Sequence, residues 1–114
     1  MGKLTTHVLD TSHGRPGAGM AVRLLDGAGA VLCDTRTNAD GRCDAPLLEG
    51  EALRVGGYTL MFAVGDYFRA MGLPLTDPPF LDVVPIAFSV SDPAAHYHVP
   101  LLVSPYGYST YRGS

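Results

Sequence analysis

Hydrophobic and polar residues alternate along most of the chain, and a period of two is the pattern of β-strands with one buried face. Near the start, Leu4, Thr6 and Val8 fall on one face of such a strand, and Thr5 and His7 fall on the other. The runs that fit a strand are 4–10, 19–26, 30–37, 42–48, 57–64, 84–90, 96–104 and 106–111. About eight short strands separated by turns predict an all-β sandwich of two sheets.

One stretch departs from the alternation and predicts a short helix. Asp66 is placed to cap it, residues 67–71 form its turns, and Gly72 suits the left-handed position after the last turn. Pro74 then prevents its continuation. The expected architecture is an all-β, two-sheet, eight-stranded sandwich with one short helix, formed by a single domain over 1–114.

Two prolines lie inside strand-like runs. Pro85 and Pro100 each lack the N–H group that a strand donates to its neighbour. Each is therefore expected at the edge of a sheet or at a β-bulge.

Composition and charge narrow the function classes. Of 114 residues, 46% are hydrophobic and 17% are charged, a balance typical of one globular domain, and the low charge favours burial of surface against other subunits. The net charge is −3 and the eight Lys and Arg residues are scattered, so no nucleic-acid partner is expected. No apolar run approaches the roughly 20 residues that cross a bilayer. No signal-peptide pattern is present, so a cytoplasmic protein is expected.

Two cysteines, Cys33 and Cys43, flank a predicted hairpin, where they could face each other. Because no secretory signal accompanies them, both are expected to be reduced thiols. The sequence contains no C-x-x-C pair, so neither a zinc ribbon nor a thioredoxin-like site is expected.

Four features could carry chemistry: His7, the pair His96 and His98, Arg42 after an Asp-Gly turn, and the stretch 111–114. The paired histidines fall on one face of a strand, about 7 Å apart from the rise per residue. At that spacing two imidazoles can share a metal or act on one substrate. Each feature also has a purely structural interpretation, since strand histidines, turn arginines and chain ends are commonly structural or solvated.

Considered together, four stretches resemble the transthyretin-like family, and specifically its 5-hydroxyisourate hydrolase branch. They are "LTTHVLDTSHGRPG", "TNADGR", "DYFRAMG" and "HYHVPLLVSPYGYSTYRGS". The resemblance runs in order from Leu4 to Ser114, and the closing "YRGS" is its most specific element. The stretch "GRPGAGM" departs from the Pro-Ala that these enzymes more often carry, in a turn outside the expected site.

The resemblance implies a transthyretin-like sandwich and a homotetramer with catalysis in a cleft where dimers meet, without a metal or a cofactor. It implies that His7, Arg42 and His98 are catalytic. It also implies that the substrate is contacted by the last four residues, Tyr111, Arg112, Gly113 and Ser114. His13 and His96 are not part of the family's core set.

The family reaction is hydrolysis of 5-hydroxyisourate to 2-oxo-4-hydroxy-4-carboxy-5-ureidoimidazoline in urate degradation. Ring opening needs a base for water, stabilisation of an oxyanion and a proton for the leaving nitrogen. His7 and His98 are expected to activate water and transfer protons, and the sequence does not assign either role to either residue. Arg42 is expected to stabilise the oxyanion.

Two alternatives stay open at this point. The imidazoles of His7, His96 and His98 could bind zinc for metal-assisted hydrolysis. The chain could instead be a carrier that binds a small aromatic ligand without catalysis, as transthyretin does. A carrier has no need of two histidines, an arginine and "YRGS" together, so the sequence favours the enzyme.

Overall fold

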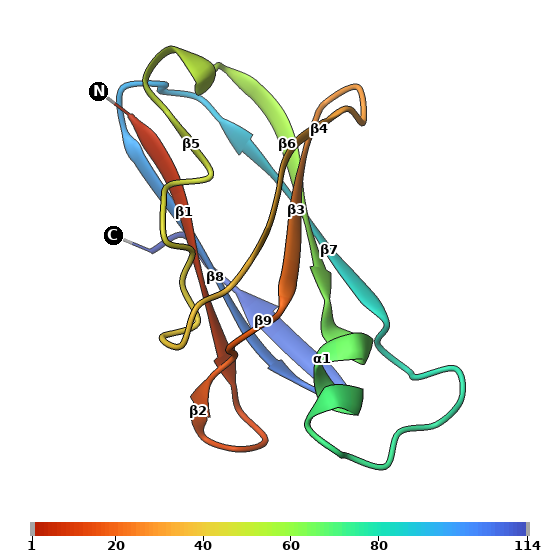
Figure 1. Ribbon diagram of the computed structural model, residues 1–114. Coiled ribbons are helices and arrows are strands. Elements are labelled where there is room, and N and C mark those ends of the chain that lie inside the picture. The colour runs from red at the N-terminus through yellow and green to blue at the C-terminus, as the bar shows by residue number, and fades with distance from the viewer. Residues whose placement is uncertain (1, 114) are drawn as a thin grey trace.

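Residues 2–113, the part of the chain that the computed structural model describes, form nine strands and two short helices (Figure 1). The strands are β1 (Lys3–Asp10), β2 (Arg15–Pro16), β3 (Ala21–Asp26), β4 (Val31–Arg36), β5 (Leu48–Glu49), β6 (Gly56–Ala63), β7 (Val83–Val90), β8 (His96–Ser104) and β9 (Gly107–Thr110). The helices are the α-helix α1 (Val64–Ala70) and the 3-10 helix η1 (Gly50–Ala52).

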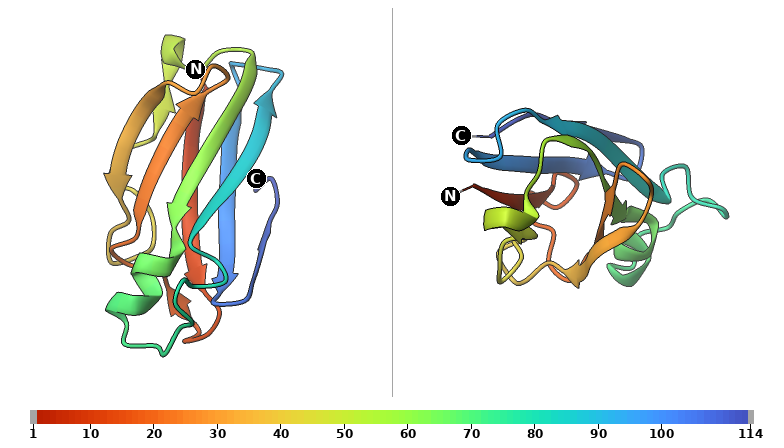
Figure 2. Two further views of the ribbon diagram at one scale, coloured as in Figure 1. Left: turned by 90° about the vertical axis from the view of Figure 1, so that its right-hand side faces the viewer. Right: turned by 90° about the horizontal axis from the view of Figure 1, so that it is seen from above.

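The strands form two sheets that pack face to face, as Figures 1 and 2 show. The first sheet has the order β2-β1-β8-β9, with β5 also paired to β1, and the second has the order β4-β3-β6-β7. The expected all-β, two-sheet sandwich with one short α-helix is therefore confirmed. The strand expected over 42–48 is mostly a loop, because only its last residue, Leu48, joins β5.

The buried core lies between the sheets and follows the alternation of the sequence. In β1, Leu4, Thr6 and Val8 are buried, and the residues between them lie on the outward face. In β8, Tyr97 and Val99 are buried in the same way. The largest fully buried side chains include Phe62, Phe68, Leu4, Met20, Leu24, Leu60 and Leu101. Full burial of one such side chain stabilises the fold by about 1.5–3 kcal/mol.

The strands β1 and β8 pair in parallel, although they are far apart in the sequence. Thr5 lies opposite His98, and His7 lies opposite Pro100. Because alternate residues of a strand point to the same face, this register puts Thr5, His7 and His98 on one outward surface. The pairing of β1 with β8 therefore positions the candidate site.

The two strand prolines have different surroundings. Pro85 lies in β7, which forms an edge of the second sheet, as its missing N–H group predicts. Pro100 lies in the interior strand β8 without a register shift, so the expectation of an edge position or a bulge is wrong for it. Its missing donor is tolerated because the β8–β9 ladder ends at the neighbouring Leu101, opposite Thr110.

The helix α1 begins directly after β6, earlier than the sequence indicates. Its N-cap is Ala63, without a capping side chain, so the expectation that Asp66 caps the helix is wrong. The N–H of Gly65 donates instead to the Asp82 carbonyl oxygen at 2.9 Å, which satisfies a donor at the helix start. Gly72 adopts the expected left-handed conformation, with a φ of 80°.

Within the described residues, no helix is long and apolar enough to cross a membrane.

A buried carboxylate holds the turn that follows β1. The Asp10 side chain accepts hydrogen bonds from the Tyr67 hydroxyl at 2.7 Å and from Nδ1 of His13 at 2.6 Å. Burial alone would raise the pKa of Asp10, but these hydrogen bonds outweigh burial and lower the pKa from its ordinary value. Since the pKa of Asp10 is lower in the folded state, its ionised carboxylate stabilises the folded protein at pH values above the ordinary carboxyl pKa. This stabilisation is lost as the pH falls through the lowered pKa of the folded state.

Replacing Tyr67 with phenylalanine is expected to lower the free energy of unfolding by about 1.5–3 kcal/mol, because a buried carboxylate loses a donor. Burial and the bond to Asp10 raise the pKa of Tyr67 to about 12, so the hydroxyl keeps its proton at neutral pH. Urea unfolding measures the change. Tyr106→Phe is the matched control, since that ring is 63% exposed and its loss of a hydroxyl should cost less than about 0.5 kcal/mol. Equal losses in the two variants would contradict the role of Tyr67.

Candidate functional site

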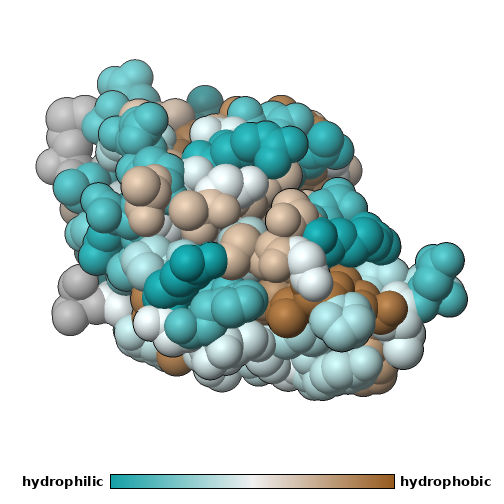
Figure 3. All heavy atoms as spheres, turned by 60° about the horizontal axis from the view of Figure 1, so that its bottom comes forward, coloured by the Kyte–Doolittle hydropathy of each residue, from teal (hydrophilic) through white to brown (hydrophobic). Residues whose placement is uncertain are grey.

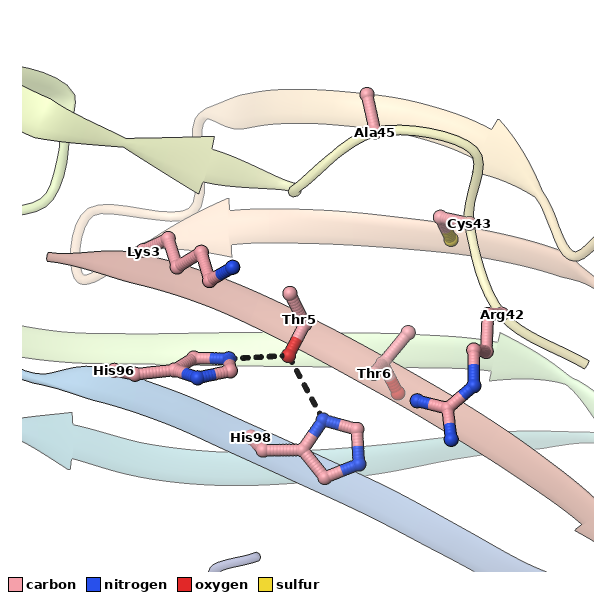
Figure 4. Close-up of a pocket in the computed structure, with 8 residues that line it drawn as sticks. All are labelled: Lys3, Thr5, Thr6, Arg42, Cys43, Ala45, His96 and His98. Atoms are coloured by element: carbon pink, nitrogen blue, oxygen red, sulfur yellow. Dashed lines mark hydrogen bonds between the residues drawn. The ribbon is translucent and has the colours of Figure 1, made fainter. Parts of the chain in front are cut away.

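The outward face of β1 and β8 carries a pocket of about 320 Å³, shown in Figure 4. It is lined by residues of β1, of β8 and of the loop between β4 and β5: Lys3, Thr5, Thr6, Arg42, Cys43, Ala45, His96 and His98. Small-molecule sites commonly measure about 300–1,000 Å³. The pocket therefore suits a small ligand of the size of one or two rings.

A tight turn in the β4–β5 loop brings Arg42 beside His7. The backbones of these two residues form an isolated antiparallel bridge, and the Gly41 carbonyl accepts a hydrogen bond from the Val8 N–H at 2.8 Å. Gly41 has a φ of 77°, and a Cβ there would collide with the carbonyl oxygen of Val8. Only glycine fits this turn, which is the reason that the Asp-Gly pair precedes Arg42.

His7 has a proton fixed at one ring nitrogen. Its Nε2 lies 2.8 Å from the carbonyl oxygen of Asp40. A carbonyl oxygen only accepts hydrogen bonds, so Nε2 carries a proton and donates it. In the neutral ring, Nδ1 is then the nitrogen with a free electron pair.

His98 is half-buried, and its two ring nitrogens have different neighbours. Nδ1 lies 2.8 Å from the Thr5 hydroxyl, and the other nitrogen is on the side of the ring that faces the Arg42 guanidinium (Figure 4). Burial, followed by the charges of Arg42, His96 and His7, holds the pKa of His98 below its ordinary value. His98 is therefore neutral at neutral pH, which is the form that accepts a proton.

Replacing Arg42 with glutamine is expected to raise the pKa of His98, because a positive charge that disfavours the imidazolium is removed. An activity that requires neutral His98 should then fall off at a higher pH on the acidic side. An NMR titration of the His98 ring protons measures the shift. Arg23→Gln is the control, since Arg23 pairs with Asp34 in the other sheet. Equal His98 pKa values in the wild type and the Arg42 variant would contradict the coupling.

The C-terminal tail reaches the site through its backbone. Gly113 forms a bridge with His98, and its N–H donates to the His98 carbonyl at 2.7 Å. A Cβ on Gly113 would lie 2.5 Å from Cδ2 of the imidazole, so the tail packs directly against the ring. Arg112 donates to the His96 carbonyl at 3.3 Å, while its guanidinium stacks over the ring of Tyr97, 4.1 Å from the centroid.

The side chains of the tail lie elsewhere in the single chain. Tyr111 and Arg112 line a separate groove of about 240 Å³ together with Ile86 and Phe88. Ser114, the last of the four expected substrate contacts, lies outside the described residues. Within one chain, no described residue of the tail lines the pocket, and the tail reaches the site only where the Gly113 backbone packs against His98.

Comparison with known proteins shows the family to which the chain belongs. The model of the HIUase/Transthyretin family matches residues 4–113. The chain belongs to this family. A 5-hydroxyisourate hydrolase of Ralstonia nicotianae is 61% identical over 117 residues, and the alignment covers 100% of both chains.

Two solved structures are similar to this chain in both sequence and shape. The structure of Klebsiella pneumoniae 5-hydroxyisourate hydrolase has a TM-score of 0.85 and 36% identity, and the match covers 100% of both chains. The crystal structure of an (S)-allantoin synthase has a TM-score of 0.95 and 43% identity over 99% of this chain. This chain spans only 44% of that longer one.

In this member of the HIUase/Transthyretin family, the pocket includes residues that sequence reasoning left out. Lys3, Thr5 and His96 line it beside His98. The alternation of the sequence could have identified them, because it puts Lys3 and Thr5 on the same face as His7, and His96 on the same face as His98. The register between β1 and β8, which joins the two faces, has no counterpart in the sequence pattern.

Cys43 also lines the pocket, but its chemistry is not that of a nucleophile. Burial, followed by the neighbouring Cys33 and Asp44, raises the pKa of the Cys43 thiol. A thiol with a raised pKa stays protonated at neutral pH, and the thiolate is the nucleophilic form. Cys33 and Cys43 are both free thiols in the described structure.

The geometry gives no basis for a three-histidine zinc site. Within residues 2–113, no group of three or more His, Cys, Asp or Glu side chains is arranged to hold a metal ion. Nε2 of His96 and Nδ1 of His98 both face the Thr5 hydroxyl. Nε2 of His7 faces the carbonyl of Asp40, so the three rings do not direct these nitrogens at one point.

Proposed function

We propose that this chain hydrolyses 5-hydroxyisourate to 2-oxo-4-hydroxy-4-carboxy-5-ureidoimidazoline, a step of urate degradation. The observation that carries the proposal is that Arg42 and His98 line one pocket, with His7 bridged to Arg42 through the backbone. The chain that holds them is 61% identical to a 5-hydroxyisourate hydrolase over its full length. A planar substrate rich in carbonyl groups complements a pocket that presents a guanidinium and imidazoles.

We assign the base to His98. Its lowered pKa keeps the ring neutral, and its Nε2 lies on the side of Arg42. Nε2 takes a proton from water while the water oxygen attacks an acyl carbon of the substrate ring. The guanidinium of Arg42 stabilises the negative charge that develops on the carbonyl oxygen.

We assign protonation of the leaving nitrogen to His7. The Asp40 carbonyl occupies its Nε2–H, which leaves Nδ1 to transfer a proton. For this step His7 carries a second proton, on Nδ1, in addition to the one on Nε2. As the carbon–nitrogen bond breaks, the Nδ1 proton moves to the leaving nitrogen, and the acyl group becomes a carboxylic acid that ionises. His98 gains one proton and His7 loses one, and exchange with solvent returns both rings to their starting states.

We further propose that the protein is a cytoplasmic homotetramer with the site at the dimer–dimer interface, where residues 111–114 contact the substrate. Exposed apolar side chains support association. Val83 begins β7 and Tyr108 lies in β9, and these two strands form edges of the two sheets. The exposed rings of Phe80 and Tyr106 lie 5.8 Å apart, and Figure 3 shows apolar side chains gathered at this end of the molecule. Sedimentation velocity measures the oligomeric state.

The catalytic proposal is tested by the ultraviolet absorbance of freshly made 5-hydroxyisourate, with and without the purified protein. Faster decay that scales with protein concentration supports hydrolysis. Decay no faster than in buffer alone would contradict the proposal and favour a small-ligand carrier. Stoichiometric zinc, with activity lost on chelation, would instead favour a metal-assisted reaction.

A further inference from the structure

The Thr5 hydroxyl connects two imidazoles that share no direct hydrogen bond. Its oxygen lies 2.8 Å from Nε2 of His96 and 2.8 Å from Nδ1 of His98. Figure 4 shows both hydrogen bonds meeting at this oxygen. The two rings lie edge to face, with centroids 6.2 Å apart and an interplanar angle of 61°, and the hydrogen-bonded link between them passes through the hydroxyl.

The backbone holds this arrangement in place. In the parallel register, Lys3 lies opposite His96 and Thr5 lies opposite His98, so the Thr5 side chain stands beside both rings on the outward face. Threonine is branched at Cβ, which restricts its χ1 angle and the direction of its hydroxyl. The contact is therefore built by the sheet rather than by a flexible loop.

A hydroxyl group has one proton, so the three groups form a chain with a direction. Thr5 donates to one ring and accepts from the other. In one arrangement, Nδ1–H of His98 donates to Thr5 and Thr5 donates to His96, which leaves a free electron pair on Nε2 of His98. In the reverse arrangement, His96 donates to Thr5, Thr5 donates to Nδ1 of His98, and Nε2 of His98 carries the proton.

We propose that Thr5 is a positioning residue that, together with His96, forms a proton relay for His98. This inference rests on the proposed function, in which His98 is the base. In the resting state, Nδ1–H of His98 donates to Thr5, and Nε2 is free to take a proton from water. The Nδ1 proton then moves to the Thr5 oxygen as the Thr5 proton moves to Nε2 of His96. One proton enters His98 and one leaves it, so its ring is neutral again.

The charges around the site favour this direction of transfer. The titratable groups that face His98 are His7 from β1, His96 from β8 and Arg42 from the β4–β5 loop, and Lys3 lies in the same pocket. All of these are positive when charged, so an imidazolium at the half-buried His98 is disfavoured. His96 is exposed, so transfer to it moves the charge toward water and away from Arg42.

Three single variants and one double variant test the relay by its effect on kcat. Thr5→Val keeps the branched shape without the hydroxyl, and we expect kcat to fall about 10²-fold with KM changed by less than about twofold. Thr5→Ser restores a hydroxyl and should recover most of the loss. His96→Gln stays polar but cannot take up the proton. Adding His96→Gln to Thr5→Val should lower kcat no further, because both changes break the same hydrogen-bond chain. Thermal unfolding checks that each variant folds.

Two kinetic outcomes would overturn the relay. One is a Thr5→Val variant with the kcat and pH profile of the wild type. The other is a double variant whose losses are additive, which would mean that Thr5 and His96 act independently.

A second measurement does not depend on turnover. In ¹⁵N NMR of the wild type, the neutral ring of His98 should carry its proton on Nδ1, and Thr5→Val should abolish that preference without changing the resonances of His7. A neutral His98 with its proton on Nε2 in the wild type would overturn the relay. A wild type that fails to accelerate 5-hydroxyisourate decay would overturn the proposed function. The NMR measurement would still show whether the hydrogen-bond chain runs from His98 through Thr5 to His96.

Discussion

Replacing His98 with alanine is expected to lower kcat/KM for 5-hydroxyisourate at least about 10²-fold, the lower bound of what acid–base catalysis contributes. The variant removes the proposed base, whose Nε2 lies on the side of Arg42, and it also removes the partner of the Thr5 hydroxyl. Because His98 lies on the outward face of β8, the core should remain intact. Initial rates from the absorbance of 5-hydroxyisourate measure the loss.

His13→Ala is the control for the removal of an imidazole. His13 bonds to Asp10 at the far end of β1, so this variant should lose stability while kcat/KM stays within about twofold of the wild type. Wild-type turnover by His98→Ala would rule out His98 as the base. A similar loss of turnover in both variants would point to folding rather than chemistry.

Gly113→Ala is expected to lower kcat/KM about 10²-fold, the penalty that a displacement of about 1 Å can cause at a reacting group. The new Cβ would lie 2.5 Å from Cδ2 of His98, so either the imidazole or the tail must move. Since Gly113 follows the last strand and packs on the outward face, the midpoint of urea unfolding should change little. Comparing rates with unfolding curves separates the two effects.

Gly107→Ala provides the matched control in the same C-terminal segment. A Cβ at Gly107 would meet only the Ser104 hydroxyl, at 3.8 Å, which is an ordinary contact. This variant should keep wild-type rates. If Gly113→Ala were as active as Gly107→Ala, the close approach of the tail to His98 would have no part in catalysis.

The alternation of the sequence predicted the sandwich and the faces of its strands. It placed Thr5 and His7 on the outward face of one strand and His96 and His98 on that of another, and both assignments agree with the burial pattern. It could not predict that these strands are parallel neighbours, because pairing between distant segments depends on the packing of the whole sheet. The hydrogen bonds of Thr5 depend on that register, which explains why sequence reasoning missed Thr5.

Two local errors have the same origin. Asp66 has the side chain of a helix cap, but the Asp82 carbonyl supplies an acceptor at the helix start from elsewhere in the fold. Pro100 has the properties of an edge residue, but it lies in an interior strand where the neighbouring ladder has already ended. In both cases the arrangement of the surrounding strands and loops, rather than the residue type alone, decided the outcome.

The parallel pairing of β1 with β8 also bears on how the molecule is made. During translation β1 emerges long before β8, and its inner edge stays unpaired until most of the domain has left the ribosome. Contacts between such remote segments are slow to form and leave an apolar strand exposed while they are missing. A nascent chain that carries His7 therefore cannot assemble the reactive surface before β8 is synthesised, and truncated products should be both inactive and prone to aggregate.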